Sequence, residues 1–149
     1  MNIPVKYRVW IKSIKKILPV VGFCFNDPTG DVEVEYPNKG QYRCWNSQKG
    51  ECVIMQYFGK KDKKDKEIYA EDIINLINEN GESINVVCEF GIARRKIFEN
   101  IVDITGFYFK LPNGKKTFPI VNNYCGKHDL ELFEVIGNTF ENPELTKIK

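Results

Sequence analysis

The stretch that decides the fold is residues 70–90, AEDIINLINENGESINVVCEF, in which two apolar runs flank an Asn80-Gly81 pair. An Asn-Gly pair in this setting is a strong signal for a β-hairpin, because both central residues of a type I′ turn need a positive φ. The run after the pair, residues 84–90, is rich in β-prone residues. The run before it also fits helical spacing, so the residues alone leave 70–78 open between strand and helix. We predict a hairpin.

Further strands, with turn residues between them, lie on both sides of this hairpin. Before it we predict a hairpin from residues 7–10 and 17–25, a half-buried strand at 31–36 and a loop or an excursion over the core at 37–50. A strand at 53–58 and a solvated charged turn at 60–66 follow. After it we predict one or two strands at 97–111 broken at Gly106, a turn at 112–114 onto a strand at 117–121, and a last strand region at 130–140 with a turn at Gly137-Asn138. Many short strands without a convincing long helix predict a mainly β fold, a small barrel or sandwich.

Size and composition are those of an ordinary globular chain. The protein has 149 residues, of which 42% are hydrophobic and 28% charged, with a formal net charge of +2. We place a soft boundary near residue 52, which separates an N-terminal β-hairpin and strand region (1–52) from a later region (53–149), and we expect both to form one compact unit. No stretch approaches the roughly 20 apolar residues of a bilayer span and no signal peptide is recognisable, so we expect a cytoplasmic protein.

Cysteine and histidine give little support for a metal site. Five cysteines without CxxC spacing argue against a disulfide framework. Cys125 and His128 have a spacing that could hold half of a zinc site, which Cys44 or Cys52 could complete, but a second close pair is lacking. We therefore expect no metal and no cofactor.

The sequence also lacks a recognisable catalytic apparatus. It contains no Walker motif, no GxGxxG, no HExxH and no GxSxG elbow. The adjacent carboxylates Glu71 and Asp72 would point to opposite faces of a strand, which favours solvated surface acids over acid–base chemistry. We predict no enzymatic activity and no catalytic residues.

The start of the chain is its one clearly basic segment. Lys6, Arg8, Lys12, Lys15 and Lys16 precede the first acidic residue. Aromatic residues are interleaved with these charges, an arrangement that can track phosphates and stack bases. Nucleic-acid binding through this segment, helped by Lys60, Lys61, Lys63 and Lys64, is therefore an alternative function.

Four segments carry a family resemblance that spans nearly the whole chain. They are residues 7–10 (YRVW), 55–63 (MQYFGKKDK), 66–74 (KEIYAEDII) and 134–145 (EVIGNTFENPEL). Together they resemble the YopX family of phage and prophage proteins. The chain departs from the family pattern where Ile11 replaces an Asp, where Lys64-Asp65 replaces an Asn-Gly turn, and where Glu71 replaces a Gly.

The resemblance implies a protein encoded by a bacteriophage or prophage, with an SH3-type β-barrel in its later part and no established molecular activity. It favours a strand for residues 70–78 and supplies no catalytic residues. Our leading hypothesis is a non-enzymatic module that binds a host or phage protein, without membrane contact, and that could self-associate. Candidate binding residues are the aromatic and basic side chains of the first half: Arg8, Trp10, Lys12, Tyr42, Trp45 and Tyr57.

Overall fold

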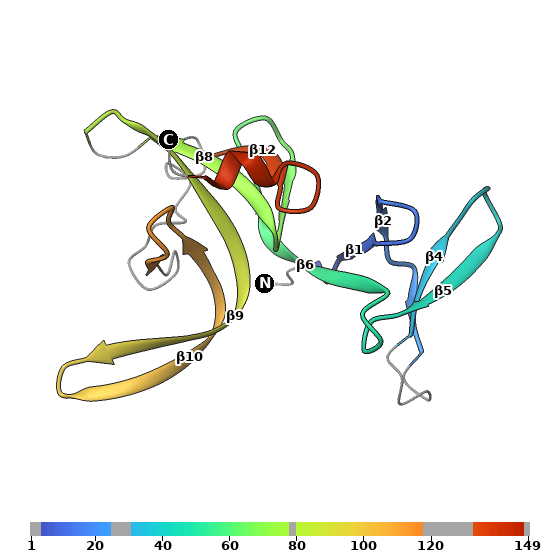
Figure 1. The fold of residues 1–149 in the computed structure, drawn as a ribbon, viewed down its shortest axis with the longest axis horizontal. Coiled ribbons are helices and arrows are strands. Elements are labelled where there is room, and N and C mark those ends of the chain that lie inside the picture. Colours follow the sequence, from blue (N-terminus) through green and yellow to red (C-terminus); the bar gives the residue numbers. More distant parts are fainter. Residues whose placement is uncertain (1–3, 25–30, 78–79, 118–132, 148–149) are drawn as a thin grey trace. The chain divides into compact units, whose positions relative to one another are not determined.

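The structure is a computed structural model that describes residues 4–24, 31–77, 80–117 and 133–147. These residues are mainly in β-strands, which confirms the predicted mainly β class, and the only helix among them is the 3-10 turn η1 (Pro143–Thr146). No helix in this part of the chain is long and apolar enough to cross a membrane. The strands are β1 (Tyr7–Ile11), β2 (Lys16–Pro19), β3 (Gly22–Phe23), β4 (Asp31–Glu35), β5 (Tyr42–Asn46), β6 (Cys52–Lys61), β7 (Glu67–Tyr69), β8 (Asp72–Ile77), β9 (Ser83–Ile97), β10 (Asn100–Lys110), β11 (Lys116–Thr117) and β12 (Glu134–Asn138) (Figure 1).

The chain divides into two compact units, Met1–Tyr57 (unit 1) and Phe58–Lys149 (unit 2). The division falls inside β6, five residues after the boundary that the sequence suggested near residue 52. β6 pairs with β1 through its first half and neighbours β7, in a sheet of order β2-β1-β6-β7. One strand therefore supplies backbone partners in both units.

Unit 1 contains the predicted first hairpin and a three-stranded sheet of order β3-β4-β5. In β4, Val32 and Val34 are fully buried while the residues that alternate with them are not, as a half-buried strand requires. They pack in one cluster with Val9, Ile11 and Cys52. Buried apolar residues that alternate along β1 and β4 thus form much of the core of unit 1.

Two expectations for unit 1 were wrong. The apolar run at 17–25 is not one strand, because β2 pairs with β1 whereas β3 pairs with β4 in the other sheet. The polar stretch 37–50 is not wholly a loop, since it contains β5, whose five residues all pair with β4. Arg43 and Trp45 share the face that Val34 and Val32 bury, so the stretch has the period of a strand despite its polar composition.

Unit 2 is built on a five-stranded sheet of order β11-β10-β9-β8-β12, which curls strongly along β9 and β10 (Figure 1). The ambiguous segment at 70–78 contains β8, a strand, and β8 pairs with β9 from Ile73 to Ile77. The predicted hairpin is confirmed, and Gly81 in its connection has a φ of +78°. Residues 73–77 thus form a strand because they pair with β9, although their apolar spacing also fits a helix.

The core of unit 2 lies on one face of this sheet. Its buried members are Ile68, Ile74, Val86, Cys88, Phe109, Phe133 and Val135. β12, which pairs with β8 through a bulge between Val135 and Gly137, supplies one of them, so the expected last strand is an integral part of the sheet. The 3-10 turn η1 follows this strand.

The long hairpin of unit 2 differs from the sequence expectation. We expected a strand ending at residue 90 and another starting at 97, whereas β9 continues to Ile97 and β10 runs unbroken through Gly106. Pro112–Gly114 does turn the chain onto β11, as predicted, while 118–121 lies outside the described residues. The chain therefore turns at Phe98, which has a φ of +53°.

The turns that depart from the family pattern keep a left-handed backbone. Asp65 has a φ of +65° and Glu71 a φ of +69°, a conformation that glycine adopts at the least cost. At both positions the resemblance to the family implies a glycine, and in this chain a non-glycine residue adopts the left-handed backbone.

Candidate functional site

The four candidate aromatic residues do not form one surface. Tyr42 on β5 is exposed over 56% of its surface, and Tyr57 on β6 over only 8%. Trp10 and Trp45 are half-buried, and Trp45 packs against the core of unit 1. Only Tyr42 is presented to solvent as an interface aromatic would be.

The basic candidates lie on or beside the first hairpin. Arg8 is half-buried on β1, and Lys12 is exposed in the turn after it. Lys6 is exposed and its ammonium lies 5.3 Å from the centre of the Tyr57 ring. Because Tyr57 is buried, this cation–π contact fixes Lys6 on unit 1 rather than offering a free stacking platform.

An aromatic–basic cluster that the sequence analysis missed lies at the rim of the unit 1 core. The ammonium of Lys16 lies 5.5 Å and the guanidinium of Arg43 6.0 Å from the centre of the Tyr36 ring. Trp45 packs edge-to-face on the same ring at 6.1 Å. We call these four residues the Tyr36 cluster. Its members come from β2, β5 and the end of β4, so spacing along the chain gave no signal for it.

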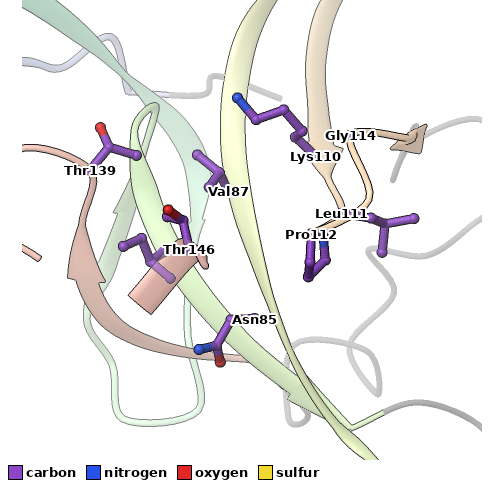
Figure 2. Close-up of a pocket in the computed structure, with 9 residues that line it drawn as sticks. Asn85, Val87, Lys110, Leu111, Pro112, Gly114, Thr139 and Thr146 are labelled. Atoms are coloured by element: carbon purple, nitrogen blue, oxygen red, sulfur yellow. The ribbon is translucent and has the colours of Figure 1, made fainter. Parts of the chain in front are cut away.

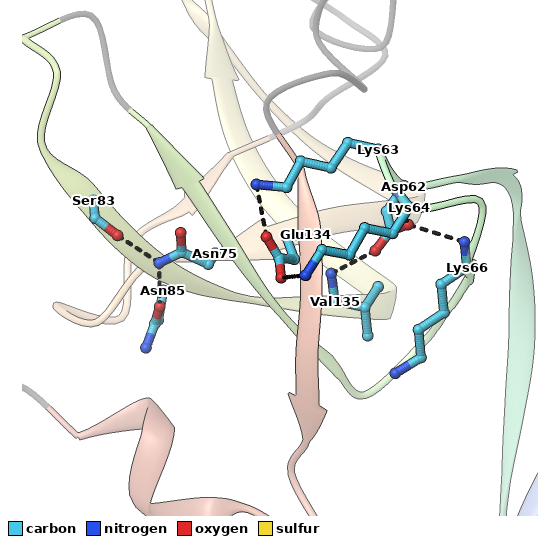
Figure 3. Close-up of polar contacts among 9 residues, drawn as sticks. All are labelled: Asp62, Lys63, Lys64, Lys66, Asn75, Ser83, Asn85, Glu134 and Val135. Atoms are coloured by element: carbon cyan, nitrogen blue, oxygen red, sulfur yellow. Dashed lines mark hydrogen bonds and ion pairs between the residues drawn. The ribbon is translucent and has the colours of Figure 1, made fainter.

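The charged turn at 60–66 contains a buried carboxylate, which corrects the expectation that the whole run is solvated. Asp62 is only 7% exposed. Its Oδ1 accepts hydrogen bonds from the backbone N–H groups of Lys64 (2.8 Å) and Lys66 (2.9 Å), and its Oδ2 accepts one from Val135 (2.8 Å) on β12 (Figure 3). Three donors can compensate the burial of one charge. Asp62 therefore joins the turn to the last strand.

Glu134 reinforces the same junction from outside. Its carboxylate forms ion pairs with Lys63 (2.6 Å) and Lys64 (Figure 3). Hydrogen bonds from these two lysines lower the pKa of Glu134 to about 2. Two lysines of the proposed nucleic-acid surface are thus engaged within unit 2.

The carboxylates Glu71 and Asp72 make separate structural contacts. Asp72 is buried and accepts a hydrogen bond from the backbone N–H of Tyr69 at 2.8 Å, which corrects the expectation of a solvated acid there. Glu71 is half-buried and accepts one from the Thr139 hydroxyl at 2.6 Å. Their side chains hold the turn between β7 and β8.

The described residues contain no group of metal-ligating side chains, and Cys125 and His128 lie outside them. Cys44 is exposed on β5, whereas Cys52 is buried in the core of unit 1. Burial raises the pKa of the Cys52 thiol, and the nearby Glu51 carboxylate raises it further. A thiolate ligand is therefore disfavoured at Cys52.

A pocket of about 190 Å³ lies on the face of the unit 2 sheet opposite its core (Figure 2). Lys110, Asn85 and Thr146 are among its polar lining residues. Each is engaged within the protein: Lys110 pairs with Glu89, Asn85 donates to the Leu145 carbonyl, and Thr146 donates to the Pro143 carbonyl. The pocket is smaller than the roughly 300 Å³ at which ligand sites begin.

Among the described residues of unit 2, the most exposed apolar surface is the outer part of the β9–β10 hairpin, residues 90–107, which we call the arm. Register places Phe90, Ile92, Arg94 and Lys96 of β9 opposite Phe107, Thr105, Asp103 and Ile101 of β10. These eight residues share one face of the hairpin, which we call the arm face. Ile92 is 64% and Ile101 70% exposed on it, and Phe98 at the tip is 91% exposed.

The arm face continues the face of the sheet that carries the core. The even-numbered side chains of β9 lie on the face of the sheet that carries the core, and Val86 and Cys88 are buried there. Phe90 and Ile92 lie on the same face further along the strand, where they are exposed. Phe107 lies at the transition, 5.0 Å from both the Phe58 and the Phe90 ring. The sheet therefore extends an apolar face beyond the part that the described residues of unit 2 cover.

One ion pair crosses the middle of the arm face. The Arg94 Nε and Nη2 atoms lie 2.9 and 3.2 Å from the two carboxylate oxygens of Asp103. This two-pronged hydrogen bond from Arg94 holds the pKa of Asp103 below its usual range. It also fixes the register of the hairpin at a point where few side chains pack.

Known proteins support the family and the fold. The model of the YopX protein family matches residues 6–147. No curated protein matches the chain. Among solved structures, the crystal structure of protein EF1440 from Enterococcus faecalis is similar, with 21% identity, a TM-score of 0.60, and coverage of 98% of this chain and 100% of that one. At this identity the likeness concerns the fold alone. The chain belongs to the YopX family.

Proposed function

We propose that this protein is a non-enzymatic protein-binding module of a phage or prophage, acting in the bacterial cytoplasm, and that the arm is its contact surface. The observation that carries the proposal is the exposure of Phe90, Ile92, Phe98 and Ile101 on one protruding hairpin. Soluble monomers rarely leave large apolar patches in water, and such patches commonly mark interaction sites.

The arm is built to hold its side chains in place. Its two strands pair residue by residue from Gly91↔Gly106 to Ile97↔Asn100, and Arg94 bridges them to Asp103. On the opposite side, Tyr108 and Ala93 are buried and pack with Ile104. A surface that is ordered before binding loses less conformational entropy on association.

The curled sheet of unit 2 is, on this proposal, an SH3-type barrel with an extended hairpin. Five antiparallel strands, strong curvature and a core on one face support it. Barrels of this type present contact residues on the loops and hairpins of a rigid scaffold, and the arm has that position. The small pocket, whose polar groups are engaged, supports binding rather than catalysis.

Site-specific photo-crosslinking in prophage-carrying cells tests the proposal. A photoreactive phenylalanine derivative at position 92 should cross-link the protein to a protein partner that mass spectrometry identifies. The same residue at position 77 is the control, because Ile77 is also a large exposed residue of the unit 2 sheet, at 47%, but lies outside the arm. Equal cross-linking from both positions, or none from 92, would contradict the proposal.

The Tyr36 cluster favours a second candidate function, nucleic-acid binding. Two cations beside one ring, with Trp45 packed against it, bring positive charge and aromatic side chains together in unit 1. Affinity for random DNA should then fall steeply between about 50 and 200 mM salt. Replacing Arg43 by Glu should abolish the mobility shift, whereas Lys49→Glu, also in unit 1, should not. No shift of the wild-type protein at low salt would eliminate this function.

A further inference from the structure

We infer that the partner of the arm face is a second copy of this chain, which packs its own arm face against the first about a two-fold axis parallel to the arm strands. The inference rests on the proposal that the arm is the contact surface. It follows from three properties of the arm face: its apolar pattern, its charge pattern and its area.

The apolar pattern resembles one half of a core. The same alternation that buries Val86 and Cys88 continues onto the arm face, where Ile92 is 64% exposed. Two sheets that pack face to face bury side chains of this kind between them. The arm face of a second copy is such a sheet surface, with Phe90 and Phe107 at one end and Ile101 near the other.

The charge pattern is self-complementary about that axis. The axis places β9 of one copy over β10 of the other in the same rows, so that Arg94 faces Asp103 of the second copy. Phe90 then faces Phe107 of the second copy, and Lys96 faces its Ile101, where the lysine stem can cover apolar surface. The Arg94–Asp103 pairs of the two copies thus combine into a four-charge group with alternating signs.

The area suffices for a dimer of modest affinity. On the arm face, Phe90, Ile92 and Ile101 are 47, 64 and 70% exposed, and the side chains of Arg94 and Asp103 are 73 and 50% exposed. At about 200 Å² for a large residue, covering these five residues on both copies would bury on the order of 1,000 Å², the lower limit for a specific interface. We therefore expect a micromolar dimer rather than an obligate one.

Sedimentation equilibrium up to about 100 µM protein tests self-association in that range. The wild-type chain should sediment as a reversible dimer, and Ile92→Glu should raise the dissociation constant at least about tenfold. Ile77→Glu is the matched control, because it adds the same charge to the same sheet outside the arm and should leave the dimer intact. A monomeric wild type, or equal weakening by both variants, overturns the inference.

A charge-reversal experiment distinguishes the proposed geometry from any other contact. Arg94→Asp alone and Asp103→Arg alone each place like charges opposite one another, both within a chain and between identical copies, so each variant should be monomeric. Mixed one to one, the variants place the two introduced charges, which have opposite signs, across the interface from each other. The unchanged Arg94 of one chain then faces the unchanged Asp103 of the other. The mixture should therefore form a heterodimer that neither variant forms alone, although the pair within each chain stays broken.

Failure of this inference and failure of the proposed function give different results. If the mixture of the two charge variants stays monomeric while the wild type dimerises, the two-fold geometry is wrong. If position 92 cross-links only to a different protein, the arm is the contact surface but a second copy does not occupy it. If position 92 cross-links to nothing, the proposed function itself fails.

Discussion

Replacing Asp62 by Asn should destabilise unit 2 more than any other single isosteric change in the charged turn. The substitution keeps the shape of the side chain, so it opens no cavity and changes only charge and hydrogen bonding. In the native protein both carboxylate oxygens accept backbone N–H groups, from Lys64 and Lys66 on one side and Val135 on the other. An amide offers an oxygen to one side and a donating NH₂ group to the other.

The magnitude follows from which donor loses its acceptor. A hydrogen bond to a charged group contributes about 1.5–3 kcal/mol, and a buried donor left unsatisfied costs about 1–3 kcal/mol. The two backbone donors of the turn can bond to water instead, but the N–H of Val135 is buried within β12. We therefore expect a loss of about 3 kcal/mol in the free energy of unfolding, a large share of the stability of a small domain.

Urea unfolding followed by far-UV circular dichroism measures this loss, with an expected shift of the midpoint of at least about 1 M. Tryptophan fluorescence is the wrong probe for it, because both tryptophans, Trp10 and Trp45, belong to unit 1. Hydrogen exchange of the Val135 amide should accelerate in parallel, since this amide loses its acceptor.

Asp65→Asn is the matched control in the same turn. Asp65 is exposed and pairs with Lys61 at 3.1 Å, and an exposed pair of this kind contributes at most about 1 kcal/mol. Asn also tolerates the left-handed backbone at this position. If Asp62→Asn and Asp65→Asn have equal, small effects, the assignment of Asp62 as the junction between the turn and β12 is refuted.

Three further predictions concern unit 2. The pKa of Glu134 is about 2 in the folded protein against an ordinary 4.5, so its carboxylate stabilises the fold above pH 4.5 and loses that contribution as the pH falls toward 2. The difference in melting temperature between wild type and Glu134→Gln should therefore vanish between these two pH values. Burial, together with Glu89, raises the pKa of Tyr108 to about 12, so this tyrosine ionises at lower pH in the unfolded state than in the folded state. The free energy of unfolding should therefore fall from about pH 10 to 12, and it should fall less in Tyr108→Phe; circular dichroism measures both. Gly137→Ala would place a Cβ 2.5 Å from the Asn142 side-chain oxygen and 3.0 Å from its Cβ, and should destabilise by about 1–3 kcal/mol in urea unfolding; an unchanged midpoint would show that the 138–142 turn can move aside.

Local sequence patterns predicted most of the strands because burial in a sheet follows a period of two. The alternation of Val32 and Val34 with acidic residues was sufficient to place β4, and the Asn80-Gly81 pair was sufficient to place the hairpin that follows β8. β5 was missed because its apolar residues are few, although its period is that of a strand. The composition of a strand is thus a weaker signal than its alternation.

The length of β9 was underestimated for a related reason. The predicted strand ended at residue 90, but Gly91 pairs with Gly106 and continues the strand into the hairpin. The alternation of β9 in fact continues past Gly91 to Ile92, a signal that the sequence contains. Following the alternation of side chains past Gly91 would have predicted a longer strand.

The candidate site was harder to predict, because residue type says little about which side of a sheet is covered. Tyr57 was chosen because exposed tyrosines often dominate the binding energy of interfaces, yet it is only 8% exposed, whereas Ile92, which is 64% exposed, was not among the candidates. The same alternation produces Cys88, which is buried, and Ile92, which is exposed. The difference between them arises from whether other segments reach that part of the sheet, and those segments, such as β12, come from positions far along the chain. An exposed apolar face is therefore a tertiary property, because it depends on which distant segments reach that part of the sheet, and among the described residues none covers Ile92.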